Sequence, residues 1–237
     1  GTSFGSAAAA NVSTLLFTTA PTLTGAAGAA NSTTASIIKG AFGDSSLSGT
    51  GSDMVTYNLG NTNGLRLLNG AGFSGEYATN LATANANVKL TANTAATTTN
   101  TNSLILNGFS VTNPGGATTL PIASASLAGN ILINSATNIA GANTTLGITT
   151  FELPILATAS STISAIIGTA TTGSVTLSGS GNVTLSGTNL YTSTTFINNA
   201  TLTAGASNVI STGGVTIVGG IYDLNGNSDT VGSISIN

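Results

Sequence analysis

The 237-residue chain contains no histidine, no cysteine and no tryptophan. Without histidine or cysteine it cannot build a Ser-His-Asp or Cys-His nucleophile system. The usual zinc, haem and iron–sulfur sites are excluded for the same reason, because these two residue types supply most of their ligands. The composition therefore predicts a protein that is not an enzyme, with no catalytic residue, no cofactor and no metal site.

Charged residues are scarce as well. Asp, Glu, Lys and Arg make up 4% of the chain, against about 25% in ordinary soluble domains. The three basic residues, Lys39, Arg66 and Lys89, are far apart in the sequence, whereas nucleic acid binding needs clustered positive charge. Apolar runs such as 163–167 are much shorter than the roughly 20 residues that span a bilayer. We expect neither nucleic acid as a partner nor insertion into a membrane.

The composition nevertheless favours a folded chain. Disordered proteins combine low hydrophobicity with high net charge, but here 41% of the residues are apolar and the net charge is −3. The lack of cysteine fits a bacterial exported protein better than a disulfide-stapled one. Residues 1–4 do not begin a signal peptide, so we expect the sequence to start inside a longer precursor and to act outside the cell, at the bacterial surface.

Short alternating segments predict β-strands throughout, because apolar and polar residues alternate in them with a period of two. Glycine and asparagine, which tolerate positive φ at a corner, bound most of these segments. Helix is nearly excluded, since no stretch keeps apolar residues at helical spacing. The predicted strands lie within residues 87–91, 103–108, 129–134, 173–179, 182–187, 215–219 and 232–236.

Many short strands with glycine and asparagine corners fit a sandwich, a barrel or a solenoid. The solenoid is favoured because the weak periodicity persists, the apolar residues are small, and only 5% of the chain is aromatic. We therefore predict an all-β fold, a parallel β-solenoid over residues 86–237 after a less regular N-terminal β region at 1–85. The side chains expected to point inward are Val175, Leu177, Val183, Leu185, Val215, Ile217, Ile234 and Ile236.

The region before the predicted rungs is less clear. Residues 11–21 suggest a strand that ends at the turn of Pro21, and residues 25–60 suggest an excursion from the stack. Tyr57, Phe73 and Tyr77 lie at or just after the end of this excursion, where we expect them to cover an exposed flank. The threonine-rich residues 91–101 suggest a rung corner or a loop.

Residues 179–205 closely resemble the autotransporter-associated β-strand repeat, with its Gly-x-Gly, Leu-Ser-Gly and Asn-x-Tyr motifs. Residues 213–234 resemble its continuation, and earlier segments are similar to the region before such repeats in large secreted proteins of planctomycete-type bacteria. Ser193 and Asn199 depart from the repeat, which prefers glycine at both positions. The resemblance implies a right-handed parallel β-helix in a very large exported protein, and it implies no catalytic residues.

Three groups of residues could form a site. Residues 223–229 place Asp or Asn at every second position, as the start of a calcium loop does, but a solenoid corner with Asx turns explains the same pattern and is favoured. Four carboxylates could include a glycosidase-like pair, although ionic caps explain them better. The tyrosines could stack on sugars, but inter-rung packing is favoured for two of them, Tyr191 and Tyr222. The residues concerned are Asp44, Asp53, Glu76 and Glu152 among the carboxylates, and Tyr57, Tyr77, Tyr191 and Tyr222 among the tyrosines.

The expected function is that of a structural module of a bacterial surface fibre or coat. A surface with almost no charge lacks the repulsion that keeps monomers apart, and an uncapped solenoid end offers free strand edges. Other copies of the chain are the expected partners. We expect residues 230–237 to pair at their outer edge, either with further rungs or with residues 12–17 of another copy. The alternative is an adhesin or passenger stalk whose residues 25–85 bind a surface polysaccharide or a host surface.

Overall fold

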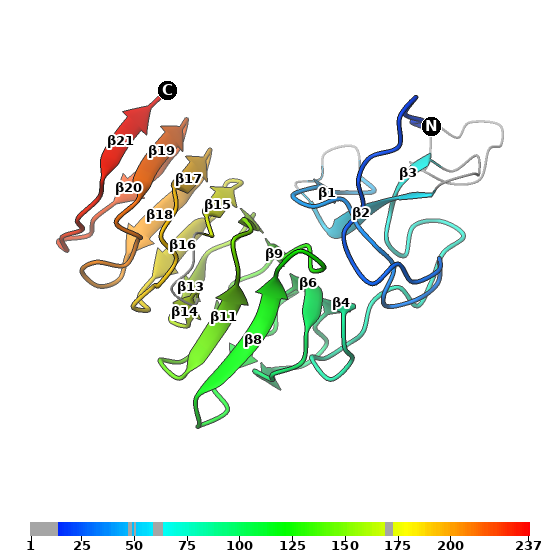
Figure 1. The fold of residues 1–237 in the computed structure, drawn as a ribbon, viewed down its shortest axis with the longest axis horizontal. Helices are drawn as coiled ribbons and strands as arrows, with labels where there is room; N and C mark the ends of the chain where they lie inside the picture. The colour runs from blue at the N-terminus through cyan, green and yellow to red at the C-terminus, as the bar shows by residue number, and fades with distance from the viewer. Residues whose placement is uncertain (1–13, 47–48, 50, 59–63, 169–172) are drawn as a thin grey trace.

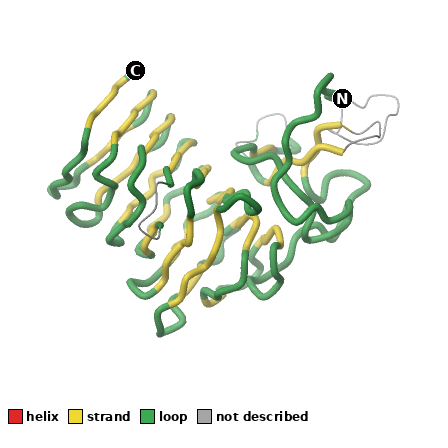
Figure 2. Tube along the Cα trace, viewed as in Figure 1, coloured by secondary structure: helices red, strands yellow, loops and turns green. Residues whose placement is uncertain are grey.

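The computed structural model describes residues 14–46, 49, 51–58, 64–168 and 173–237. These residues contain strands, turns and loops and no helix (Figures 1 and 2). From Ala86 onward the strands stack in parallel and form a β-solenoid, as predicted. The residues before it form a less regular region, which lies on the opposite side of Figure 1 from the last strand.

The largest sheet of the solenoid has eight strands, and all neighbouring strands in it are parallel. All seven strand segments predicted from the sequence coincide with strands of the solenoid, six of them in this sheet and one, 182–187, in the next. The strands of the eight-stranded sheet are β4 (Ala86–Lys89), β6 (Thr101–Ile105), β9 (Asn130–Ile133), β12 (Leu153–Ala157), β15 (Val175–Ser178), β17 (Thr195–Asn198), β19 (Gly214–Val218) and β21 (Ser233–Ile236).

Two more parallel sheets complete the rungs. A seven-stranded sheet contains β5 (Thr94–Ala95), β7 (Val111–Thr112), β10 (Thr137–Ile139), β13 (Ser161–Ile163), β16 (Asn182–Leu185), β18 (Thr201–Ala204) and β20 (Ile221–Asp223). A three-stranded sheet, β8 (Thr118–Ala123), β11 (Thr144–Ile148) and β14 (Ile166–Ile167), closes the middle rungs. The threonine-rich segment 91–101 is a rung corner, and it contains the short strand β5.

The core consists of columns of aliphatic side chains, one from each rung. Parallel register places residues of successive rungs directly above one another, so that an inward-facing position stays inward. Val175, Leu177, Val183, Leu185 and Val215 are buried as predicted, and Ile217 is partly buried against them.

The last two predicted core residues are not buried. Ile234 and Ile236 are in register with Val215 and Ile217, and therefore continue the inward-facing columns. Their side chains are nevertheless 61% and 75% exposed. The reason is that β21 pairs with β19 on one side and has no strand on its other side among the described residues.

Glycine and asparagine occupy tight positions of the rungs. A Cβ atom on Gly187 would lie 2.4 Å from the carbonyl oxygen of Ala165 in the rung below, which is closer than atoms can approach. Asn199, which replaces a glycine of the repeat that the chain resembles, has φ of 53°. Asparagine adopts this left-handed conformation more readily than most residues, so the departure is compatible with the rung.

The N-terminal region contains a three-stranded antiparallel sheet of β1 (Phe42–Gly43), β2 (Asp53–Asn58) and β3 (Gly64–Leu67). The predicted strand at 11–21 is wrong for its described part, because residues 14–21 contain no strand. The Leu15 carbonyl accepts one hydrogen bond from Leu65 N–H. Phe17 N–H, however, donates to the Tyr57 hydroxyl and not to a backbone carbonyl, so no strand pairing continues here. Residues 11–13 lie outside the described residues.

This region packs on the outer face of the eight-stranded sheet. Ile37, Met54 and Leu68 form a second apolar cluster with Ile105 and Leu132, whose side chains point away from the solenoid core. Polar contacts hold the same face through the Asn87 and Asn130 side-chain amides: Asn87 Nδ2 donates to Ala35 O (2.7 Å), and Asn130 Oδ1 accepts from Gly40 N–H (2.8 Å).

The first rung of the solenoid is covered. Ala78 forms a parallel bridge with Val88, in which Ala78 N–H donates to Asn87 O (2.8 Å) and Lys89 N–H donates to Ala78 O (2.9 Å). Leu81 is fully buried in the same apolar cluster as the rungs. Residues 78–81 therefore pair the free edge of β4 and close the core beneath it.

Candidate functional site

Within the described residues, the last rung leaves its outer edge unpaired, in contrast to the first. Asn237 N–H donates to Ile217 O (2.9 Å), and backbone groups alternate sides along a strand. The N–H and C=O groups of Ile234 and Ile236 therefore point away from β19. Neighbouring apolar side chains are also exposed: Val218 by 42%, Ile221 by 58% and Leu224 by 43%. An apolar surface beside unpaired strand groups is a site for strand addition.

The corner at residues 223–229 lies beside this open end. Asp223 Oδ1 accepts from Asn225 N–H (2.8 Å), which is an Asx turn, and Asn225 and Gly226 have φ of 48° and 78°. Asp229 accepts a hydrogen bond from the Tyr222 hydroxyl. Burial and this carboxylate raise the pKa of Tyr222. One Asx turn, at Asp223, is thus present at this corner, and no group of three or more Asp or Glu side chains gathers within the described residues.

The four other carboxylates have separate partners. Glu76 is buried and accepts from both terminal nitrogens of Arg66, at 2.6 and 2.7 Å. Asp53 pairs with Lys89 (3.0 Å), and Asp44 caps Ser46 N–H (2.7 Å). Glu152 accepts from the Thr176 hydroxyl. Ionic and capping contacts thus account for the carboxylates that suggested a glycosidase-like pair.

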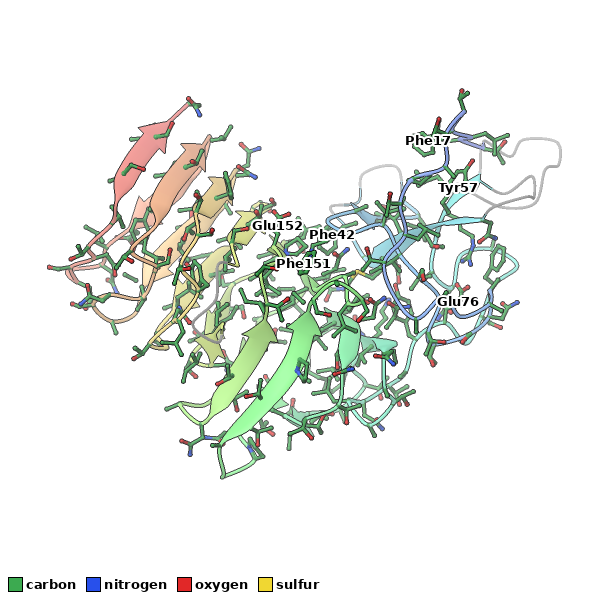
Figure 3. All side chains as sticks on the ribbon, in the orientation of Figure 1. Phe17, Phe42, Tyr57, Glu76, Phe151 and Glu152 are labelled. Atoms are coloured by element: carbon green, nitrogen blue, oxygen red, sulfur yellow. The ribbon has the colours of Figure 1, made fainter. Side chains whose placement is uncertain are left out.

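The tyrosines do not form a stacking surface for sugars. Tyr191 lies in the core, where its hydroxyl contacts Thr195 Oγ1 (2.8 Å) and burial raises its pKa to about 12. Tyr222 packs against the same core, so the expected inter-rung packing of both residues is confirmed. Tyr57 is buried beside Phe17, with ring centroids 5.6 Å apart (Figure 3), and the Tyr77 hydroxyl accepts from Met54 N–H.

A cleft of about 520 Å³ lies where the N-terminal region meets the solenoid. Phe42 and Glu152 line it from the two sides, close to Phe151 (Figure 3). Thr176, Ser178 and Asn198 extend from β15 and β17 into the same cleft. The cleft combines the Phe42 ring with hydroxyl and amide groups and the Glu152 carboxylate.

Lys39 lies next to this cleft. Its Nζ atom is 5.4 Å from the centre of the Phe151 ring, and it is buried without a hydrogen bond to any described residue. Burial lowers the pKa of Lys39, and the charge of Glu152 partly opposes this. Sequence reasoning missed this arrangement, because Lys39 and Glu152 are far apart in the chain and no local motif connects them.

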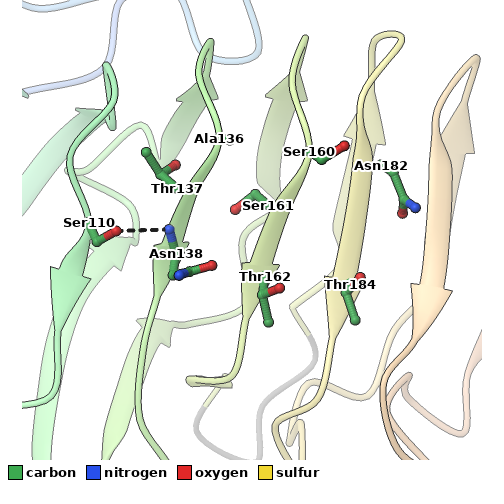
Figure 4. A pocket seen from close by; sticks show the side chains of 9 residues that line it. All are labelled: Ser110, Ala136, Thr137, Asn138, Ser160, Ser161, Thr162, Asn182 and Thr184. Atoms are coloured by element: carbon green, nitrogen blue, oxygen red, sulfur yellow. Dashed lines mark hydrogen bonds between the residues drawn. The ribbon is translucent and has the colours of Figure 1, made fainter.

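The outer face of the seven-stranded sheet carries a polar pocket of about 320 Å³ (Figure 4). Register aligns Asn138, Thr162, Thr184 and Thr203 in one column across four strands. Ser160, which precedes β13, and Asn182, the first residue of β16, lie beside this column. The face thus carries hydroxyl and amide groups without a single charge among these six residues.

Searches of known protein families, curated proteins and solved structures return no match for this chain. The resemblance to the autotransporter-associated repeat therefore stays a prediction from the residues. No described residue belongs to a helix that is long and apolar enough to cross a membrane.

Proposed function

We propose that this chain is a structural β-solenoid module that associates with other copies of itself through its open end. The observation that carries the proposal is the difference between the two ends of the stack. Residues 78–81 cover the first rung, whereas β21 leaves strand groups and the side chains of Ile234 and Ile236 exposed. Isolated solenoids need polar caps to remain soluble, and the described residues place none over β21.

The surface composition supports the same role. Only nine Asp, Glu, Lys and Arg residues occur in the chain, so long-range repulsion between copies is weak. A location at the outer surface of a bacterial cell, in a fibre or coat, is part of the proposal. It rests on the absence of cysteine and on the resemblance to repeats of exported proteins.

Sedimentation velocity over a range of protein concentrations tests self-association. The unmodified chain is expected to form a concentration-dependent oligomer, and Ile236→Lys is expected to abolish it, because a charge would then sit on the open edge. Ile236 is already 75% exposed, so the change spares the fold. Thr119→Lys, on the exposed surface of β8, is the matched control and should associate normally. A monomer at all concentrations would refute the proposal.

A second candidate is the adhesin, favoured by the cleft between Phe42 and β15. An aromatic ring beside hydroxyl and amide groups suits a surface polysaccharide. Binding to bacterial or host polysaccharides immobilised on an array would be measured for the unmodified chain and for Phe42→Ala and Ser178→Trp. The adhesin role requires that both changes abolish binding, and binding that survives them would exclude this cleft.

A further inference from the structure

We infer that the cleft between Phe42 and β15 selects a polysaccharide whose sugars carry a free amine, and that the Glu152 carboxylate binds this amine. The inference rests on the second candidate function, binding of a surface polysaccharide in this cleft, and names the chemical class of the ligand. The cleft measures about 520 Å³, which is within the roughly 300–1,000 Å³ of sites for small ligands. It therefore has room for a short stretch of sugar rings.

The charge of the cleft comes from one residue. Among the described residues that line it, Glu152 is the only charged one. Glu152 is exposed, and one of its carboxylate oxygens accepts from the Thr176 hydroxyl, which fixes the side chain at the wall of the cleft (Figure 3). No described residue donates to the other oxygen. This oxygen is available to accept a hydrogen bond from a ligand ammonium group.

The three basic residues of the chain do not oppose a cationic ligand. Arg66 and Lys89 each form an ion pair with a carboxylate. Lys39 lies nearest to the cleft, but its Nζ atom is buried, 5.4 Å from the centre of the Phe151 ring. A sugar ammonium in the cleft thus meets a carboxylate with no exposed ammonium or guanidinium group beside it among the described residues. A uronate would meet the same carboxylate and be repelled.

The remaining walls suit the uncharged part of a sugar. The Phe42 ring offers an apolar face on which a sugar ring can stack, and its π-system also attracts a cation. The Ser178 hydroxyl and the Asn198 amide are neighbours on β15 and β17. Neither side chain forms a hydrogen bond with another described residue, so both can bind sugar hydroxyl groups.

Isothermal titration calorimetry with three oligosaccharides of the same linkage and length tests the inference. Oligomers of glucosamine, N-acetylglucosamine and glucose carry an amine, an acetamide or a hydroxyl at the same ring carbon. The titrations are done below the pKa of the sugar amine, where it is an ammonium group. The unmodified chain is expected to bind the glucosamine oligomer at least about tenfold more tightly than the other two, as for a hydrogen bond between charged groups.

Two variants with the same change in net charge locate this preference. Glu152→Gln keeps an acceptor for the Thr176 hydroxyl and removes the charge, so it should lower binding of the glucosamine oligomer to the level of the other two. Asp223→Asn removes an exposed carboxylate from β20, outside the cleft, and should keep the full preference. A preference that survives Glu152→Gln, or that both variants lose equally, overturns the inference.

Other outcomes separate the inference from the function on which it rests. Equal binding of the three oligomers, lost in Phe42→Ala, overturns the selection of an amine and leaves the cleft as a polysaccharide site. A chain that binds none of them overturns the inference as well. In that case, binding to another polysaccharide on the array that Phe42→Ala abolishes would still support the adhesin role.

Discussion

Leu156 and Ser178 are neighbours in one outward-facing column of the eight-stranded sheet, and the chemistry of the column changes between them. On the side of Leu156 the column continues through Leu132 and Ile105, which pack against the N-terminal region. On the other side it continues through Asn198, which lines the cleft. The change from apolar to polar residues therefore marks the border of the surface that the N-terminal region covers.

Leu132→Ala should loosen the N-terminal region from the solenoid. Leu132 is fully buried between the two parts, and removal of a buried leucine side chain typically costs about 2–5 kcal/mol. We expect faster proteolysis within residues 14–85 and unchanged β-sheet circular dichroism. Ser178→Ala, in the same column beyond the covered surface, is the control. Equal protease resistance of both variants would show that Leu132 does not hold this region.

Val183→Asp should destabilise the solenoid itself. Val183 is 1% exposed in β16, and burying an unpaired charge there should cost several kcal/mol. Thr184→Asp places the same carboxylate on the outer face of the same strand and should change stability by about 0.5 kcal/mol. Urea unfolding of both variants measures the difference. Similar midpoints for the two would contradict the assignment of inner and outer faces.

Gly187→Ala should be destabilising because of the close approach of two rungs. The new methyl group would lie 2.4 Å from Ala165 O, so the rungs must separate locally; overpacking of this kind typically costs about 1–3 kcal/mol. Gly116→Ala is the control, since a Cβ atom there meets no atom within 4 Å. Thermal melts should show a lower midpoint for Gly187→Ala alone, and two equal midpoints would refute the steric argument.

Glu76→Gln should destabilise the N-terminal region strongly. The change leaves the buried Arg66 guanidinium without its carboxylate, and removal of one partner of a buried ion pair typically costs about 3–5 kcal/mol. Asp53→Asn, which removes the carboxylate of the more exposed Asp53–Lys89 pair, should cost at most about 1 kcal/mol. Hydrogen exchange of residues 64–81 is the measurement. Unchanged exchange in Glu76→Gln would show that the ion pair contributes little.

Stability should be nearly independent of pH between about 5 and 9, because the chain has no histidine. Burial raises the pKa of Glu76, but hydrogen bonds from Arg66 and from Asn69 and Asn31 N–H outweigh it and hold this pKa below its usual 4.5. The folded state thus binds a proton less readily than the unfolded state. The Glu76 carboxylate therefore stabilises the folded state above about pH 4.5, and this stabilisation is lost as the pH falls further. Urea midpoints from pH 3 to 9 measure this, and a transition inside the flat range would contradict it.

The local pattern of the sequence was sufficient for the strands and their inner faces. Alternation of side chains and the positions of glycine and asparagine act within one rung, so residues 173–187 could be assigned from their neighbours alone. The expected strand at 11–21 failed because its hydrogen bonds depend on Leu65 and Tyr57, which are distant in the chain.

By itself, the sequence determined an all-β parallel solenoid with a small aliphatic core and almost no charge, since these properties follow from composition and period. Only the tertiary structure decided which end of the stack is covered and where the cleft lies. Ala78 and Leu81 close the first rung, and Lys39 lies beside Phe151. These contacts join segments outside the repeating pattern of the rungs, so the periodicity of the sequence could not predict them. The exposure of Ile234 and Ile236 has the same origin, because burial of an inward-facing side chain requires a neighbouring rung on both sides.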